Sequence, residues 1–327
     1  MFSGSSRWQL WLSLALVVVV IILFIALVDL QTTYQLLLGA DGAVLLLAAA
    51  ALIAGYGLLA VRWRTLLGNR PSWTQSFHSV NLGNLANTLT PLPGDPVRIL
   101  VISTTPTVSV AMSTSTAIVE RLLEQLLRLA AFGGMLYLGL GIEVSARLTS
   151  ASMLIVGIGF FSLVLLGHYA ERISPALSTA ITRIPGLGKE LARRLVIDLM
   201  QGFLTAGKPR QLLIAGAQSV VIWAFFLGYH FLVLRAFDAP LSFEQSLALA
   251  LASLAIVPPS APAMPGVYQA TIVAPLSVLG DIDPALLTAY AVALYIIQGL
   301  CLLVLGIWGL TRTQFNTAEL MASAVEE

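Results

Sequence analysis

Six charged side chains stand inside otherwise apolar stretches of the sequence, where a charge is costly unless it is paired. They are Asp95, Arg98, Glu120, Arg121, Glu124 and Arg128, three acidic and three basic. On a helix, residues three or four positions apart share a face, so Glu124 is spaced to meet both Arg121 and Arg128. Two interpretations stay open: a structural ion-pair network that joins helices, or a balanced polar site for a charged ligand.

A proline-rich break directly precedes Arg98, and it strengthens the case that this residue binds a ligand. Residues 91–96 read PLPGDP. Backbone N–H groups that such a break leaves free can act together with a guanidinium group to hold a phosphate. We therefore expect a substrate site that includes Pro93, Gly94, Asp95, Arg98, Glu120, Arg121, Glu124 and Arg128.

A second broken segment resembles the first. Leu-Pro-Gly at residues 92–94 returns as Met-Pro-Gly at residues 264–266, which is 172 positions later. Interrupted helices in both halves of a chain are typical of the binding site of an inverted-repeat transporter. We expect this segment to add Pro262, Pro265, Gly266 and Gln269 to the substrate site.

The composition sets the class of protein that must position these residues. Of the 327 residues, 58% are hydrophobic and only 10% are charged, and the mean hydropathy is +0.90. A soluble domain carries about 25% charged residues, so a soluble globule is excluded. The net charge of +1 gives no basic patch for nucleic acid. One cysteine and three scattered histidines point to no metal site, and we expect no cofactor.

Uncharged stretches long enough to cross a bilayer predict an all-α polytopic membrane protein. Six full spans are expected at residues 7–29, 41–62, 116–140, 148–170, 211–234 and 284–311. Basic residues, including Arg62, Arg64 and Arg70, gather in loops on one side, so the positive-inside rule predicts that both termini are cytoplasmic. The whole chain, residues 1–327, is expected to form one integral membrane domain. Residues 171–210 should form a cytoplasmic loop with an amphipathic helix at residues 191–203.

This topology leaves each broken segment to begin and end on one side of the membrane. Residues 76–115 would dip in from the cytoplasm and residues 245–280 from outside, as re-entrant segments of an inverted repeat. The alternatives are two ordinary short spans in each segment, giving eight spans, or a span over residues 99–119. Every version implies a polar interior, because irregular backbone at membrane depth must be buried in protein or line a cavity.

Three motifs in order resemble the flippase-like family, whose best-known members are the transmembrane domains of lysylphosphatidylglycerol synthases. Residues 94–98, GDPVR, are similar to its Gly-acid-x-x-Arg motif, and residues 119–124, VERLLE, to its Glu-Arg-x-x-acid motif. Residues 259–270 resemble its second Pro/Gly-rich motif. The chain departs from that motif with Ala263-Met264 in place of Gly-Gly and Tyr268-Gln269 in place of Arg-Glu, so Gln269 cannot titrate.

The resemblance implies that the chain is a flippase that moves a phospholipid or glycolipid between the leaflets of the inner (cytoplasmic) membrane. The lysyl-transferase domain of the fused synthases is not seen, so no lipid aminoacylation is expected and the chain is not expected to be an enzyme. Two alternatives remain: a non-transporting partner of a glycosyltransferase or lipid synthase, and an integral membrane enzyme acting on lipid phosphates. Hydroxyl groups at residues 103–116 would line the groove or satisfy the helix backbone.

Overall fold

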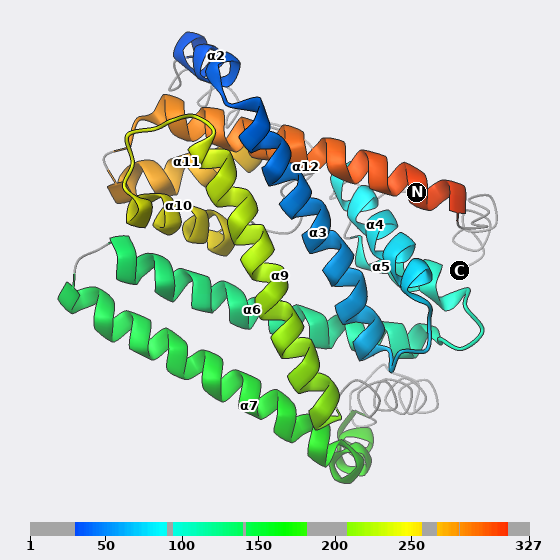
Figure 1. The fold of residues 1–327 in the computed structure, drawn as a ribbon. Helices are drawn as coiled ribbons and strands as arrows, with labels where there is room; N and C mark the ends of the chain where they lie inside the picture. The colour runs from blue at the N-terminus through cyan, green and yellow to red at the C-terminus, as the bar shows by residue number, and fades with distance from the viewer. Residues whose placement is uncertain are drawn as a thin grey trace, which may run out of the picture. The chain divides into compact units, whose positions relative to one another are not determined.

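The protein is all-helical throughout the part of the chain that the structure describes (Figure 1). The computed structural model describes residues 30–89, 94–139, 142–181, 208–256, 267–280 and 282–312. The helices are α2 (Leu30–Gly39), α3 (Gly42–Leu66), α4 (Trp73–Leu89), α5 (Asp95–Ser103), α6 (Val110–Gly139), α7 (Ile142–Ile181), α9 (Pro209–Arg235), α10 (Phe243–Ile256), α11 (Val267–Gly280) and α12 (Pro284–Arg312). The predicted all-α class is confirmed.

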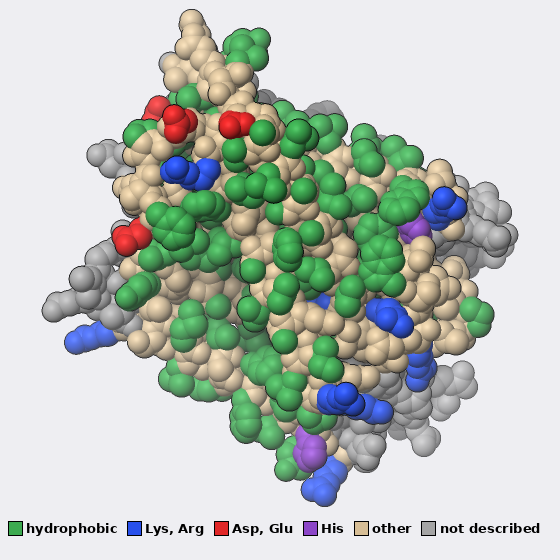
Figure 2. Space-filling model, in the orientation of Figure 1, with side chains coloured by type: hydrophobic (Ala, Val, Ile, Leu, Met, Phe, Trp, Pro, Cys, Tyr) green, Lys and Arg blue, Asp and Glu red, His purple; other side chains and the backbone are tan. Residues whose placement is uncertain are grey.

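Four stretches within these helices are long and apolar enough to cross a membrane. They are Gly42–Leu66 in α3, Arg147–Leu165 in α7, Pro209–Arg235 in α9 and Pro284–Arg312 in α12. Hydrophobic side chains accordingly make up most of the coloured side-chain surface in Figure 2. Helix α6 has 30 residues and matches the charged span predicted at residues 116–140, but its charges set it apart from these apolar helices. The prediction of a polytopic membrane protein is therefore confirmed.

Two sequence predictions lie wholly outside the described residues, and a third lies partly outside them. The first span, predicted at residues 7–29, lies outside them, and so does the amphipathic helix predicted at residues 191–203. Helix α7 continues to Ile181, so the beginning of the predicted 171–210 loop is helical.

Each half of the chain repeats one order of helix lengths: long, short, short, long. In the first half, α3 to α6 have 25, 17, 9 and 30 residues. In the second half, α9 to α12 have 27, 14, 14 and 29 residues. At about 1.5 Å per residue, α5 extends less than half of the hydrocarbon thickness, and α10 and α11 also fall short of it. These lengths favour re-entrant pairs over two full spans in each segment.

The alternative of a span over residues 99–119 is wrong. Helix α5 ends at Ser103, and α6 begins only at Val110, with turns between them. Thr104 and Thr105 donate their backbone N–H groups to Val101 and Ile102, which closes the end of α5. Pro106 lies in this connection, and a proline there cannot donate the backbone hydrogen bond that a continuous helix would need.

The second helix in each half begins with the same reciprocal capping box. Ser72 N–H donates to Gln75 Oε1 at 2.8 Å, and Gln75 N–H donates to Ser72 Oγ at 3.1 Å. Ser242 and Gln245 repeat both bonds at 2.9 and 3.1 Å at the start of α10. Such a box satisfies two N–H groups that a helix start leaves without partners. Its recurrence at matching places supports an internal repeat, and the Ser-x-x-Gln-Ser spacing was already visible in the sequence.

The turns that lead into these boxes also match. The chain leaves α3 through Asn69, with φ 58°, and leaves α9 through Asp238, with φ 46°. Asn and Asp are among the few residues other than glycine that adopt this left-handed backbone readily. The two halves therefore share the same local chemistry at the helix end, the turn and the next helix start.

Contacts divide the chain into two compact units, each of which contains one of the short helix pairs, α4–α5 or α10–α11. The first unit comprises Met1–Leu52, Arg128–Leu154 and Phe225–Leu300, and the second comprises Ile53–Leu127, Ile155–Ala224 and Cys301–Glu327. In the second unit, two buried clusters lie beside the C-terminal end of α3. One joins α3 to α4, α5 and the start of α6 through Trp63, Leu67, Val80, Ile102, Val108 and Met112. The other joins α3 to α6 and α9 through Leu66, Val119, Leu123, Leu212 and Ala215.

Helices α4 and α5 form an antiparallel hairpin in which two glycines allow the backbones to approach closely. A Cβ added at Gly83 would lie 2.8 Å from the Gly94 carbonyl oxygen and 2.9 Å from Arg98 Cβ. A Cβ added at Gly94 would in turn overlap the Gly83 carbonyl. Gly94 has φ −72°, an ordinary helical value. The glycine of the GDPVR motif is therefore required by the close approach of two backbones and not by its own backbone angle.

We predict that Gly94→Ala lowers the free energy of unfolding by about 1–3 kcal/mol, because the added methyl group forces the hairpin apart. Gly57→Ala on α3 is the matched control, since a Cβ there meets nothing within 4 Å and removes a flexible residue from a helix. Unfolding in mixed detergent micelles measures both variants. Equal stability of Gly94→Ala and the parent protein would contradict the proposed backbone contact.

The re-entrant arrangement predicts which residues share a side of the membrane. In a Cys301→Ser background, cysteines at the exposed positions Thr74 and Thr107, which flank the α4–α5 hairpin, should react with an impermeant thiol reagent from the same side. Cysteines at the exposed positions Glu244 and Pro284, which flank α10 and α11, should both react from the opposite side. Labelling in sealed vesicles of known orientation measures this. Opposite sides for Thr74 and Thr107 would show that the segment crosses the membrane.

Candidate functional site

Six charged side chains in the second unit form a closed ring in which signs alternate. Going around it, the order is Arg62, Glu120, Arg98, Asp95, Arg121, Glu124 and back to Arg62. Each member contacts two members of opposite charge, and we call the set the ion ring. The N···O distances are 2.6 Å for Arg62–Glu120, 3.0 Å for Arg62–Glu124, 2.8 Å for Arg98–Asp95, 2.8 Å for Arg121–Asp95 and 3.0 Å for Arg121–Glu124, with Arg98–Glu120 as the sixth pair.

Three helices supply the ring, and helical spacing explains two of its contacts. Asp95 and Arg98 are three residues apart on α5, and Arg121 and Glu124 are three residues apart on α6. Such pairs lie on one face of a helix. Asp95 is also in the first turn of α5, where the positive end of the helix dipole stabilises a carboxylate. The remaining contacts need tertiary packing, which brings α3 and α5 to α6.

The ring has a buried arc and an accessible arc. The side chains of Arg62, Glu120 and Arg98, which we call the inner arc, are 0%, 1% and 10% exposed. Those of Asp95, Glu124 and Arg121, the outer arc, are 24%, 21% and 37% exposed. Charges removed from water are tolerated only when they are fully paired and hydrogen-bonded. The inner arc is therefore suited to hold the ring in place, and the outer arc is where a ligand can reach it.

Neutral side chains fix the inner arc further. Arg62 Nη1 donates to Ser219 Oγ on α9 at 3.0 Å. The guanidinium carbon of Arg98 lies 4.9 Å from the centroid of the Trp63 ring, a distance at which a cation is attracted to the aromatic face. Trp63 is itself held by its Nε1–H, which donates to Thr116 Oγ1 at 3.1 Å. These contacts pre-organise the two buried arginines before any ligand arrives.

Arg62 is the residue that the sequence analysis placed wrongly. It was assigned to a cytoplasmic loop after the second span, but α3 continues through it to Leu66 and it is fully buried in the ring. The apolar run that continues at Trp63, Leu66 and Leu67 was the signal that the helix did not end there. A first charge after an apolar stretch therefore did not mark the membrane boundary.

Arg128 was expected in the charge network, but none of the six ring contacts involves it. Its guanidinium Nη1 donates to the backbone carbonyl of Leu254 at the end of α10, at 3.3 Å. That contact connects α6 with α10 within the first unit. Arg62 takes the place in the charge balance that the sequence analysis gave to Arg128, so the ring still sums to zero.

The other predicted site residues divide between the described and the undescribed parts of the chain. Gly94 lies in the hairpin contact, directly before the ring residue Asp95. Gln269 is buried on α11. The remaining four, Pro93, Pro262, Pro265 and Gly266, lie outside the described residues, and their predicted roles stay predictions.

The hydroxyl groups between residues 103 and 116 mostly satisfy their own helices. Ser103 Oγ donates to the Ile99 carbonyl and Thr114 Oγ1 to the Val110 carbonyl, each one turn earlier. Ser103 also contacts Ser113 across the connection between α5 and α6, at 3.0 Å. These hydroxyls hold backbone and helices together. Among the described residues, no group of three or more His, Cys, Asp or Glu side chains is placed to hold a metal ion.

The ring predicts energetic coupling between residues far apart in the sequence. Arg62→Gln and Glu124→Gln should each destabilise the protein, and the double variant should be more stable than the sum of the two effects implies by about 0.5–3 kcal/mol, because each single change leaves a charge with one partner fewer. Arg70→Gln is the control: Arg70 is exposed and donates to the Thr107 carbonyl. It should combine additively with Glu124→Gln. Unfolding measurements give both cycles, and additivity in the first would refute the ring as a coupled unit.

Comparison with known proteins identifies the family. The family model described as the lysylphosphatidylglycerol synthase TM region matches residues 10–306, which include every helix that contributes to the ion ring. No curated protein and no solved structure matches the chain. The match covers most of the sequence and agrees with the resemblance carried by the GDPVR and VERLLE motifs, whose charged residues form five of the six members of the ring. The chain therefore belongs to the family of lysylphosphatidylglycerol synthase transmembrane regions.

Proposed function

We propose that the chain is a lipid flippase that moves a phosphate-bearing head group between the leaflets of the inner membrane, with both of its own termini in the cytoplasm. One observation carries this proposal: a neutral, closed ring of six charges on helices of a membrane protein, with one arc accessible. A lipid's tails can stay in hydrocarbon while its head group crosses, so the protein must supply only a polar site for the head group. The ring is such a site.

Arg121 is the member best suited to meet the phosphate. Its side chain is the most accessible of the ring, whereas Arg98 is nearly buried between Glu120 and Asp95. A guanidinium group binds a phosphate through two parallel hydrogen bonds, as it binds a carboxylate. The phosphate can therefore replace either carboxylate on Arg121. This moves the first contact with substrate from Arg98, where the sequence analysis placed it, to the outer arc.

The free-energy cost of that exchange is low because each carboxylate has a second arginine partner in the ring. When a phosphate displaces Asp95 from Arg121, Asp95 keeps Arg98, and when it displaces Glu124, Glu124 keeps Arg62. Neither acid is left as an isolated charge, which would cost several kcal/mol if it were buried. An amine in the head group can in turn pair with the released carboxylate oxygen. Movement of the lipid down its concentration gradient through this site requires no energy source.

Two other functions make different predictions in one assay. Reconstituted vesicles with a panel of lipids would show transfer of unaltered head groups if the chain is a flippase. Chemically altered lipid would indicate an enzyme acting on lipid phosphates. Neither transfer nor alteration, with the folded protein present, would favour a non-transporting partner of a glycosyltransferase or lipid synthase.

The flippase proposal predicts that Arg121→Lys loses most transport. Lysine keeps the charge but lacks the planar fork, so the phosphate contact is weakened, and we expect the rate to fall at least about tenfold. The assay follows lipids with native head groups and a fluorescent acyl chain in proteoliposomes, with a membrane-impermeant quencher outside. Arg70→Lys, at an exposed arginine away from the ring, should transport like the parent. Parent-like transport by Arg121→Lys would contradict the assigned contact.

A further inference from the structure

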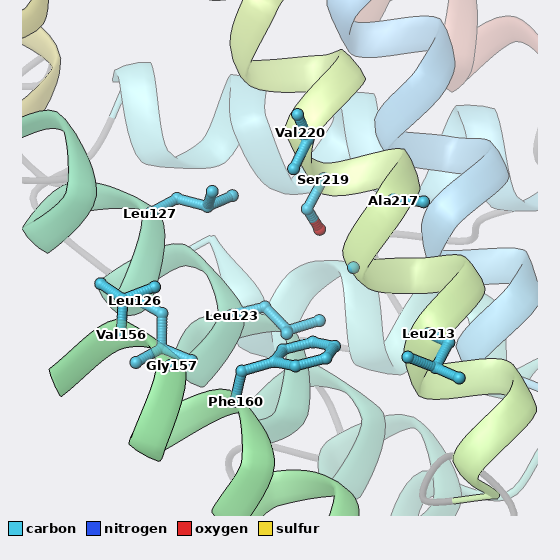
Figure 3. A pocket seen from close by; sticks show the side chains of 11 residues that line it. Leu123, Leu126, Leu127, Val156, Gly157, Phe160, Leu213, Ala217, Ser219 and Val220 are labelled. Atoms are coloured by element: carbon cyan, nitrogen blue, oxygen red, sulfur yellow. The ribbon is translucent and has the colours of Figure 1, made fainter. Parts of the chain in front are cut away.

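An apolar pocket lies within the second unit, between α6, α7 and α9, and has a volume of about 440 Å³. Figure 3 shows side chains from the three helices around it, with the Phe160 ring beside Leu123. All lining residues are apolar or glycine except Ser219. The volume is in the range of small-molecule sites, which run from about 300 to 1,000 Å³.

The inner end of the pocket adjoins the ion ring. Ser219, its one polar lining residue, accepts the hydrogen bond from Arg62 Nη1. On α6, the lining residue Leu127 lies three residues after the ring residue Glu124, so the two are neighbours on the helix surface. A molecule in the pocket would therefore have its inner end next to Ser219 and the charged ring.

The outer end of the pocket is open. Leu213 and Val220 on α9 line it and are 56% and 60% exposed, and Gly157 on α7 is exposed as well. These residues lie in the two helical stretches, one in α7 and one in α9, that are apolar and long enough to span a membrane. Their exposed apolar surface would face hydrocarbon, because such helices stand in the bilayer. The pocket is thus apolar and open on an apolar surface, and the charged ring lies next to its inner end.

Ser219 in the pocket binds Arg62, and Arg62 in turn pairs with Glu124 of the outer arc at 3.0 Å. From this chain of contacts we propose that the pocket holds one fatty acyl chain of the same phospholipid whose phosphate meets the outer arc of the ring. The proposal rests on the proposed function and adds to it a second subsite and a substrate class. The substrate is an amphiphile whose phosphate and acyl chain are both bound by the protein. Part of its binding energy comes from methylene groups removed from the bilayer into the pocket, and part from the phosphate on Arg121.

The chain offers a matched pair of variants to test this. Gly157 lines the pocket, and a Cβ built there meets nothing within 4 Å, so Gly157→Phe places an aromatic ring at the pocket lining without a clash at its Cβ. Gly228 on α9 does not line the pocket, and a Cβ there also meets nothing within 4 Å, so Gly228→Phe is the control. Gly216 is unsuitable, because a Cβ there would lie 2.8 Å from the Phe160 ring.

The experiment uses the full chain in phosphatidylcholine nanodiscs that contain phosphatidylglycerol with a diazirine at the end of one acyl chain. After illumination, labelled peptides are mapped by mass spectrometry. We expect labels on the lining segments of α6, α7 and α9, at least about tenfold fewer in Gly157→Phe (about 1.4 kcal/mol) and an unchanged yield in Gly228→Phe. Diacylglycerol with the same labelled chain but no phosphate should label these segments at least about tenfold less.

Equal labelling of Gly157→Phe and the parent, or equal labelling by diacylglycerol, would overturn the proposal and leave only ordinary boundary lipid at this surface. Scrambling by the parent chain is measured separately in vesicles. Scrambling without labels in the pocket would overturn the acyl-chain site and leave the proposed function standing. Phosphate-dependent labels in a chain that scrambles no lipid would support the acyl-chain site and reject the flippase proposal.

Discussion

The structure of the second unit depends on the rule that a charge removed from water must have a partner. Arg62 and Glu120 are buried completely, so neither can be accommodated without the other, and Arg98 completes the neutralisation of Glu120. Satisfying these three side chains brings α3, α5 and α6 together. The glycine contact in the α4–α5 hairpin lies at the same place, since a Cβ at Gly83 would lie 2.9 Å from Arg98 Cβ, and Arg98 pairs with Glu120. The pairing of the ring charges and the close packing of the α4 and α5 backbones are therefore parts of the same arrangement.

Much of this arrangement could be predicted from the sequence, because hydropathy and helix spacing are local properties. Apolar length identified the long helices, and spacing by three identified the Arg121–Glu124 pair. The role of Arg62 could not be obtained in this way, because its contact with Glu120 joins residues 58 positions apart and depends on how α3 packs on α6. The prominence given to Arg128 has the same origin. Its spacing on α6 fits a pair with Glu124, but spacing alone does not say which helix faces it.

The family assignment indicates the class of protein, whereas the ion ring and the apolar pocket indicate how a lipid could bind to it. The family assignment places the chain among membrane proteins related to lysylphosphatidylglycerol synthases. The ring accounts for how a charged head group could enter such a protein, and the apolar pocket beside Ser219 accounts for where a hydrocarbon chain could stay. Their adjacency within one compact unit matters more than either feature alone, since a phospholipid is a charged group attached to an apolar one.

An alternating ring of six charges has two complete pairings, much as a benzene ring has two bond patterns. In one pairing, Arg62 takes Glu124, Arg121 takes Asp95 and Arg98 takes Glu120, so every pair joins two helices. In the other, Asp95–Arg98 lies wholly within α5, Arg121–Glu124 lies wholly within α6, and Arg62–Glu120 joins α3 to α6. The second pairing contains no link between α5 and α6. The ring charges of the α4–α5 hairpin are thus neutral by themselves. The hairpin could move away from α6, and each ring charge on the hairpin and on α3 and α6 would still have a partner of opposite sign.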